Sequence, residues 1–150
     1  MSKKLIFTRM IDAPRELVYE AWTDPEHMAA WWGPDNFTNA RCEMDVRPGG
    51  RICIDMEGPD GRVYPMTGVF LEVVAPEKLV FSAMALHDEQ GKARVEVKNT
   101  VLLEPYDGKT RLHLSSEVVW SAPGTEDTVS RIETSWSQSL NKLMLLPVVL

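Results

Sequence analysis

The ionisable side chains that could act as a general acid or base are few, and the sequence disperses them. Glu96 and Glu117 fall on what read as neighbouring strands, and a carboxyl group enclosed in a cavity there could move a proton on or off a substrate. Alternation along the second strand instead points Glu117 toward solvent together with His113. His27 falls on the exposed side of a short helix and His87 in a polar loop. Because no His/Asp/Ser or Cys/His set converges in the predicted order of elements, we predict no catalytic residues.

The two cysteines, Cys42 and Cys53, lack the CxxC spacing of redox and zinc motifs and have no histidine near them in sequence. Strand alternation places them on opposite faces of a sheet, which predicts two free thiols. The sequence also has no GxGxxG pattern and no phosphate-binding loop, since the glycines of RPGG (47–50) and GPDG (58–61) belong to turns. We therefore expect no metal and no cofactor.

Aromatic side chains gather beside a turn, where they could hold an apolar ligand. Residues 31–37 read WWGPDNF, so two tryptophans run into a Gly-Pro turn and Phe37 follows it. Neighbouring positions on a helix differ in direction by about 100°. We therefore expect one of Trp31 and Trp32 to fill the core and the other to face a cavity mouth or the surface. Plain core packing is the alternative for either ring taken singly.

Methionine supplies a second apolar signal. The chain has 8 methionines, several of them on predicted strands. Met fills irregular space and adapts to varied apolar partners, which suits a pliable pocket, while Met in place of Leu in an ordinary core is the alternative. The residues predicted to line a cavity, with Ser116 as the polar member, are Trp31, Trp32, Phe37, Met44, Met56, Met66, Phe70, Phe81, Met84, Leu114, Ser116, Val118, Trp120, Trp136 and Leu140.

The elements that must position these side chains follow from periodicity and turns. A strand over 4–12 precedes two short helices, each with a proline, Pro14 or Pro25, in its first turn. From Phe37 onward the period is two. Even-numbered residues such as Ala40 and Cys42 are apolar and are predicted to point inward. The even-numbered residues after RPGG are apolar as well, so keeping both sets on one face requires a loop of odd length or a bulge.

A series of strands joined by short turns leads to a last helix. That helix carries an apolar stripe at intervals of three and four residues, made of Val129, Ile132, Trp136, Leu140 and Leu143. The order predicts an α+β fold. It consists of an antiparallel sheet of six to seven strands, with two short helices after the first strand and a long C-terminal helix laid on one face.

Composition limits the partners and the compartment. At 150 residues and 44% apolar content, we expect a single domain over residues 1–150 with a real core. A net charge of -6 argues against nucleic acid and anionic membranes, because both attract clustered Lys and Arg. The first ten residues lack the apolar stretch of a signal peptide, so we expect a cytoplasmic protein. The apolar end LMLLPVVL (143–150) either packs on another subunit, as in a homodimer, or caps the chain's own sheet.

Five motifs in order resemble one family. They are RMIDAPRELVYEAWTDPEHMAAWWGP (9–34), DVRPGG (45–50), the pattern DG…Y…G.F.EV (60–73), PEKLVFS (76–82) and SWSQSLNKL (135–143). Together they resemble the bacterial family similar to the C-terminal domain of the activator of the ninety-kilodalton heat-shock protein ATPase. That family lies in the START-like helix-grip superfamily, which includes the birch-pollen allergen. The resemblance covers nearly the whole chain. Ser135 departs from it, because many members have Gly there.

The resemblance implies a curved sheet with a cavity between it and the long helix. We expect this cavity to bind a small, mainly hydrophobic molecule, because its predicted lining is Trp, Met and Phe with few polar groups. A protein that stimulates a heat-shock chaperone ATPase is an alternative that rests on the resemblance alone. An enzyme of the cyclase or hydrolase type, acting on a hydrophobic substrate, is another. It would need an ionisable group such as Glu96 or His113 buried in the cavity.

Overall fold

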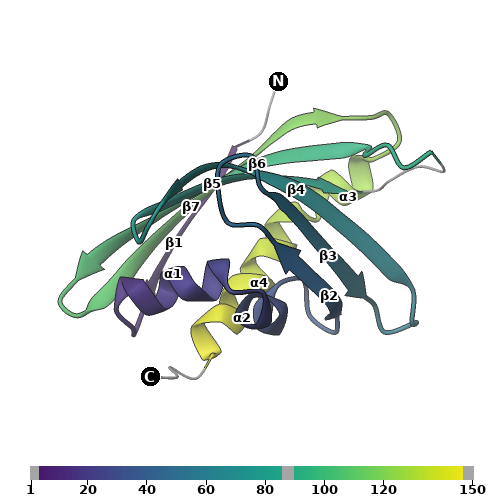
Figure 1. Cartoon of the computed structure of the whole chain (residues 1–150). Coiled ribbons are helices and arrows are strands. Elements are labelled where there is room, and N and C mark those ends of the chain that lie inside the picture. Colours follow the sequence, from purple (N-terminus) through teal and green to yellow (C-terminus); the bar gives the residue numbers. More distant parts are fainter. Residues whose placement is uncertain (1–3, 86–89, 147–150) are drawn as a thin grey trace.

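The computed structural model describes residues 4–85 and 90–146. Their elements are β1 (Lys4–Ile11), α1 (Arg15–Thr23), α2 (Pro25–Trp31), β2 (Thr38–Met44), β3 (Arg51–Glu57), β4 (Val63–Val74), β5 (Lys78–Ala85), β6 (Val95–Tyr106), β7 (Lys109–Ser121), α3 (Glu126–Ser130) and α4 (Ile132–Leu145). The strands of the described part form one seven-stranded sheet in the order β1-β7-β6-β5-β4-β3-β2, and every pairing in it is antiparallel (Figure 1). This confirms the predicted α+β helix-grip fold. No helix in the described ranges is long and apolar enough to cross a bilayer.

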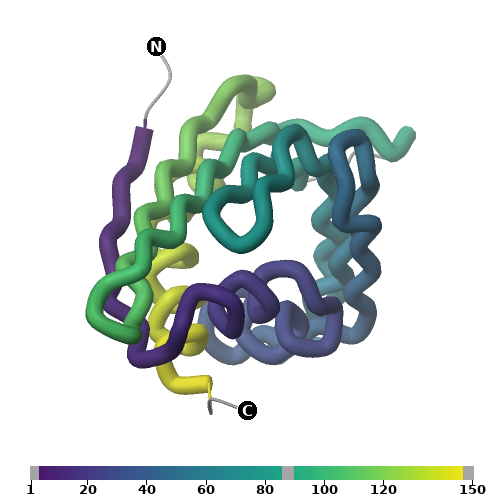
Figure 2. Tube along the Cα trace, turned by 60° about the vertical axis from the view of Figure 1, so that its left-hand side comes forward, coloured from purple at the N-terminus to yellow at the C-terminus, as the bar shows by residue number. Residues whose placement is uncertain are grey.

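The sheet curves around the helices. In Figure 1 it arches over α1, α2 and α4, and the turned view in Figure 2 shows α1 and α2 closing its open side, between the edge strand β1 and the strands β2 and β3. Asp24 begins α2 by accepting hydrogen bonds from the backbone N–H groups of Glu26 and His27, as an N-cap residue should. The two short helices therefore cover the concave face of the sheet, and the core lies between the helices and the sheet.

Register keeps the apolar side chains of neighbouring strands on the same inner face. Ile54 pairs with Met66, and Phe70 pairs with Phe81, all four of them buried. Burial of each such side chain contributes roughly 1.5–3 kcal/mol to stability. Cys42 pairs with Ile54 on this face. Cys53 directly precedes Ile54 on β3, so strand alternation turns it to the outer face. Both thiols are free, as the alternation predicts.

The turn at RPGG has the odd length that the pattern requires. Met44 pairs with Ile52, so an odd number of residues separates the two inward side chains. A Cβ added at Gly50 would collide with the backbone carbonyl of Asp45, which is why the turn closes on glycine. Arg47 donates from Nε to Asp45 Oδ2 at 2.7 Å, and both side chains are exposed. The two side chains form a local ion pair, which contributes less than about 1 kcal/mol.

A β-bulge in β2 changes which residue faces inward. The register shifts between Asn39 and Arg41, so Ala40 is left without a partner and is exposed, contrary to the alternation. Asn39 turns inward instead, and its Nδ2 donates to the carbonyls of Ala29 at 2.8 Å and Trp32 at 2.9 Å. This side chain therefore ties the edge strand β2 to the end of α2.

The last helix consists of two parts rather than one. α3 ends at Ser130 and α4 begins at Ile132, with Arg131 between them. Beyond the break, the stripe residues Trp136, Leu140 and Leu143 are buried against the sheet and α2. Leu143 and Leu146 pack on the chain's own core, while Leu145 is 82% exposed. The rest of the apolar end, 147–150, lies outside the described residues, and a homodimer stays a prediction.

Candidate functional site

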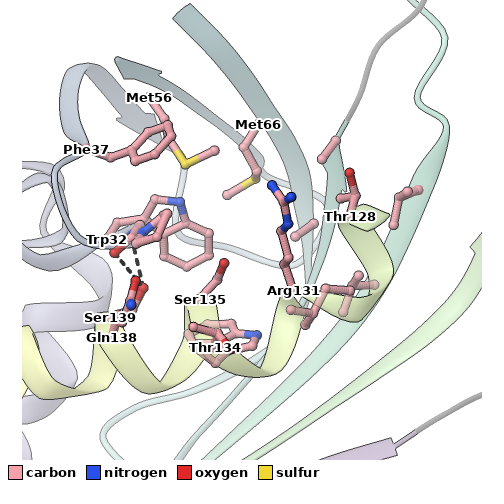
Figure 3. A pocket seen from close by; sticks show the side chains of 18 of the residues that line it. Trp32, Phe37, Met56, Met66, Thr128, Arg131, Thr134, Ser135, Gln138 and Ser139 are labelled. Atoms are coloured by element: carbon pink, nitrogen blue, oxygen red, sulfur yellow. Dashed lines mark hydrogen bonds between the residues drawn. The ribbon is translucent and has the colours of Figure 1, made fainter. Parts of the chain in front are cut away.

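A cavity of about 610 Å³ lies between α4 and the inner face of the sheet (Figure 3). Its size falls within the range of roughly 300–1,000 Å³ typical of small-molecule sites. It is lined by Trp32, Gly33, Pro34 and Phe37 from the end of α2 and the loop after it, Met56, Met66, Ala83, Ala85, Val95, Val97 and Asn99 from the sheet, and Thr128, Arg131, Ile132, Thr134, Ser135, Trp136, Gln138 and Ser139 from the C-terminal helices.

The two adjacent tryptophans separate in the structure. Trp31 is fully buried, its ring centroid is 4.6 Å from that of Trp22, and its Nε1 donates to the Ala21 carbonyl at 2.9 Å. Trp32 is the C-cap of α2 and has extended backbone angles, which turn its ring toward the cavity. There it meets Trp136 edge to face at 5.3 Å, a favourable aromatic geometry. Trp31 is thus part of the core, and Trp32 forms a wall of the cavity.

The loop after Trp32 is fastened to α4. We call residues 33–35 the latch loop. Gly33 donates from its backbone N–H to Ser139 Oγ at 3.1 Å, and the same hydroxyl donates to the Gly33 carbonyl at 2.9 Å. From the residue next to Ser139, Gln138 Oε1 accepts a hydrogen bond from the Asp35 N–H at 2.9 Å. Gly33 has φ +98°, a left-handed conformation that glycine adopts without strain. Figure 3 shows Ser139 and Gln138 side by side below Trp32.

A lysine adds a further contact to the latch loop. Lys142 donates from Nζ to the Pro34 carbonyl at 3.2 Å. Partial burial lowers the pKa of Lys142, against the opposing influence of the nearby Asp35 carboxylate. The loop that forms one wall of the cavity is therefore bound through its backbone to three side chains of α4, which span about one helical turn.

A chain of polar groups runs behind the cavity. Trp136 donates from Nε1 to Ser116 Oγ at 3.1 Å, and Ser116 donates to Asn99 Oδ1 at 2.7 Å. Asn99 is 0% exposed, lines the cavity, and has no partner for its Nδ2 among the described residues. The sequence predicts Ser116 as the inward polar group, and the structure confirms that it points inward and is buried. It is Asn99, which the prediction missed, that reaches the cavity.

Charge in the cavity comes from one residue. Arg131 is the only charged side chain among the described lining residues, which include no carboxylate and no histidine. Glu96 pairs with Trp120 and faces away from the cavity, and His113 lies 3.8 Å from Glu104 outside it. Neither Glu96 nor His113 lines this cavity, although an enzyme with acid–base chemistry would need such an ionisable group there. His87 lies outside the described residues.

The thiol of Cys42 does not offer a nucleophile. Burial raises its pKa to about 11, and the negative charge of Asp24 acts in the same direction. The thiol therefore stays protonated at neutral pH, whereas thiolate is the reactive form. A surface group of Glu20, Asp24 and His27 brings its ligand atoms within 4.8 Å of one another, but Asp24 already caps α2. We assign no metal to it.

Five of the residues predicted to line a cavity do so: Trp32, Phe37, Met56, Met66 and Trp136. Others on the inner face belong to the packed core and do not reach the cavity; they are Phe70, Phe81, Leu114 and Leu140, with Met44 partly buried against them. Val118 pairs with the lining residue Val97 and is partly buried.

Two predicted residues point to the outer face. Met84 lies between Ala83 and Ala85, which both line the cavity, so strand alternation turns Met84 away. The register of β6 and β7 shifts so that Val97 pairs with Val118 but Glu96 pairs with Trp120. This bulge reverses the face of the following residues, and Trp120 is 52% exposed.

The sequence reasoning missed the residues that create the space. Ala83 and Ala85 on β5 are small, and they leave room opposite α4. At the start of α4 and along it, the lining comes largely from polar side chains beside the apolar stripe, including Arg131, Ser135 and Gln138. One signal was present in the sequence: Asn99 interrupts an alternating run of Val95, Val97, Val101 and Leu103, where an inward amide is unusual.

Comparison with known proteins places this geometry in a family. A family model described as "Activator of Hsp90 ATPase homolog 1-like protein" matches residues 12–146. None of the curated proteins searched is similar enough to count as a relative.

Solved structures agree over nearly the whole chain. A protein from Rhizobium leguminosarum has a TM-score of 0.82 and 22% identity, covering 97% of this chain and 93% of its own. A protein from Chromobacterium violaceum has a TM-score of 0.75 and 26% identity, covering 94% of each chain. The AHSA1 protein of Silicibacter pomeroyi has a TM-score of 0.77 and 24% identity, covering 95% of each. The chain therefore belongs to the family of Activator of Hsp90 ATPase homolog 1-like proteins.

Proposed function

We propose that this protein binds a small, mainly hydrophobic molecule in the cavity between α4 and the sheet. The observation that carries the proposal is the cavity itself, about 610 Å³ in volume and walled by Trp32, Phe37, Met56, Met66 and Trp136. Cores normally close such space, because protein interiors pack as densely as organic crystals. A space of this size, bounded by aromatic rings and thioethers, is suited to an apolar guest.

The lining residues suggest how tightly such a molecule binds. A ligand that buries about 300 Å² of apolar surface gains roughly 7 kcal/mol at 25 cal/mol per Å². That gain alone corresponds to a Kd of about 10 μM, and loss of ligand freedom offsets part of it, so we expect dissociation constants from tens of micromolar to millimolar. Met56 and Met66 have flexible side chains, so the cavity can adapt its shape to the guest.

Binding is favoured over catalysis by the chemistry of the walls. The described lining has no carboxylate, histidine or cysteine, so it offers no base to transfer a proton or to activate its Ser and Thr hydroxyls as nucleophiles. A ligand would then leave the cavity unchanged. Stimulation of a chaperone ATPase is the second hypothesis, and it is supported by the family alone.

The test is a binding experiment with a filled cavity as its comparison. Protein purified under native conditions is examined by native mass spectrometry for a co-purifying molecule. Intrinsic Trp fluorescence is then followed during titration with fatty acids, sterols and aromatic compounds. Ala83→Phe places a ring inside the cavity, while Met84→Phe adds the same ring on the outer face of the same strand. Thermal unfolding of both variants establishes that they are folded.

We expect saturable quenching in the unmodified protein and in Met84→Phe, and its loss in Ala83→Phe. Equal binding by folded Ala83→Phe would locate the ligand elsewhere and overturn the proposal. Absence of any bound mass and of any response across the panel would also overturn it. An ATPase assay with the chaperone from the same cell would then become the next experiment.

A further inference from the structure

Resting on the proposed function, we propose that the ligand is an aromatic acid of defined layout. Its planar apolar body lies between the aromatic walls, its carboxylate binds Arg131 at the exposed end of the cavity, and a carbonyl oxygen on its ring system accepts from Asn99 at the buried end. Three features of the cavity carry this assignment: an unpaired buried amide, a single cation, and walls made of rings.

The buried amide calls for an acceptor on the ligand. The Ser116 hydroxyl accepts from Trp136 and donates its own proton to Asn99 Oδ1. That bond turns the amide so that Nδ2, with its two N–H donors, is left without a partner among the described residues. Asn99 is fully buried, and an unsatisfied buried donor is rare in a native protein. Because Asn99 lines the cavity, an oxygen of the ligand can satisfy it.

The single cation calls for a single negative charge. Arg131 sits at the break between α3 and α4, is exposed, and forms no ion pair with any described residue. Figure 3 shows its side chain extending from the start of α4 across the cavity toward Met66. A guanidinium matches a carboxylate through two parallel hydrogen bonds. One cation neutralises one carboxylate, whereas a phosphate monoester would bring an excess charge into an otherwise apolar cavity.

The position of this cation is notable against the charge of the whole protein. The net charge is -6, so the protein as a whole repels anions. The described lining nevertheless has no carboxylate beside Arg131, and its other polar groups are neutral hydroxyls and amides. Arg131 therefore attracts an acidic ligand to this cavity.

The walls favour a flat ring system over a flexible chain. Trp32 and Trp136 meet edge to face, and Phe37 lies on the same side of the cavity as Trp32. Aromatic surfaces bind planar rings with geometric preference beyond the area buried. The thioethers of Met56 and Met66 face them and also make favourable contacts with aromatic rings.

The ligand side of the test uses matched compounds and isothermal titration calorimetry. The probes are anthraquinone carboxylate and fluorenone carboxylate, which place the carbonyl at different distances from the acid. Fluorenone carboxylate is compared with fluorene carboxylate, which lacks its one carbonyl, and anthraquinone carboxylate with anthracene carboxylate, which lacks both of its carbonyls. Each ketone acid is also compared with an analogue that carries a methyl group in place of the acid. For the ketone acid that binds more tightly, loss of the carbonyl or of the carboxylate is expected to lower the affinity by about tenfold or more. Each of these groups forms a hydrogen bond with an otherwise unpaired protein group.

The protein side assigns each loss to its residue. In Arg131→Gln, removal of the acid should no longer weaken binding, and Arg131→Lys should restore part of the preference. In Asn99→Leu, removal of the carbonyl should no longer weaken binding. Circular dichroism tests whether Asn99→Leu is folded. If it is unfolded, the ligand comparison in the unmodified protein decides whether the carbonyl contributes to binding.

The outcomes separate this inference from the function on which it rests. If the acid-free or carbonyl-free compounds bind as tightly as the ketone acids, the layout is wrong, although the cavity still binds apolar molecules. If fatty acids or sterols bind and all the ring acids fail, the layout is also wrong. If the preferences persist unchanged in folded Arg131→Gln and Asn99→Leu, those residues do not make the proposed contacts.

Discussion

Replacing Ser139 with alanine should weaken the attachment of the latch loop to α4 and lower the stability of the protein. The Ser139 hydroxyl both accepts from the Gly33 N–H at 3.1 Å and donates to the Gly33 carbonyl at 2.9 Å. Gly33 and Ser139 are both buried, so water does not readily replace the lost partner. Two buried backbone groups left unpaired cost about 2 to 4 kcal/mol together.

The higher helix propensity of alanine offsets part of that cost. Alanine is a better helix former than serine by about 0.5 kcal/mol, so the net decrease in the free energy of unfolding is about 1.5 to 3.5 kcal/mol. For a protein of this size the melting temperature should fall by roughly 5 to 10 °C. Urea unfolding, followed by circular dichroism and Trp fluorescence, measures the change in free energy.

Ser137→Ala is the matched control, since it makes the same substitution two residues away on α4. No hydrogen bond of the Ser137 hydroxyl occurs among the described residues, so this variant should be unchanged or slightly more stable. A Ser139→Ala variant within about 0.5 kcal/mol of the Ser137→Ala variant would refute the view that the latch loop depends on these two bonds.

Two further results are expected from other parts of the molecule. Because burial raises the pKa of Cys42 to about 11 from an ordinary 9.0, the stability it contributes is fully present below the pKa of the unfolded thiol and is lost as the pH rises toward about 11. Urea titrations across this range should show the loss, and Cys42→Ala should reduce it. Trp120→Gln, on the outer face, should change stability by less than about 0.5 kcal/mol and leave ligand titrations unaltered; a marked loss of binding would contradict the bulge.

Much of the fold could be predicted because strands and helices leave periodic traces. The even-numbered residues around Ile52 and Ile54 point inward as predicted, and the parity across RPGG correctly required an odd loop. α2 begins at Pro25, in its first turn as predicted, whereas Pro14 is the N-cap of α1 and lies just before the first turn. In each confirmed case a local rule is sufficient, because the residues that obey it are close in sequence.

The errors arise where one residue breaks the period. The bulges in β2 and between β6 and β7 each insert a residue that composition does not reveal, so Ala40 and Trp120 were assigned to the wrong face. Arg131 likewise divides a helix whose apolar stripe appears continuous.

The cavity itself was harder to predict than the sheet. Empty space depends on which side chains are small at facing positions far apart in sequence, as with Ala83 on β5 and Ser135 on α4. The prediction ranked large apolar residues and so selected several, such as Phe81 and Leu140, that fill the core. Asn99 could have been found as a polar residue within an inward alternation, because a buried amide needs partners.

The pairing of β1 with β7 has a consequence for the order in which the chain can fold. Lys4 pairs with Glu117 and Ile11 pairs with Thr110, so β1 can meet its only neighbour in the described sheet only after all the elements between β1 and β7 have been synthesised. Trp22 and Trp31, carried on the helices in between, need that sheet to cover them. High contact order of this kind slows folding and prolongs the exposure of apolar surface on the nascent chain. Synthesis that stops before β7 would leave β1 unpaired, and such a fragment would be prone to aggregate.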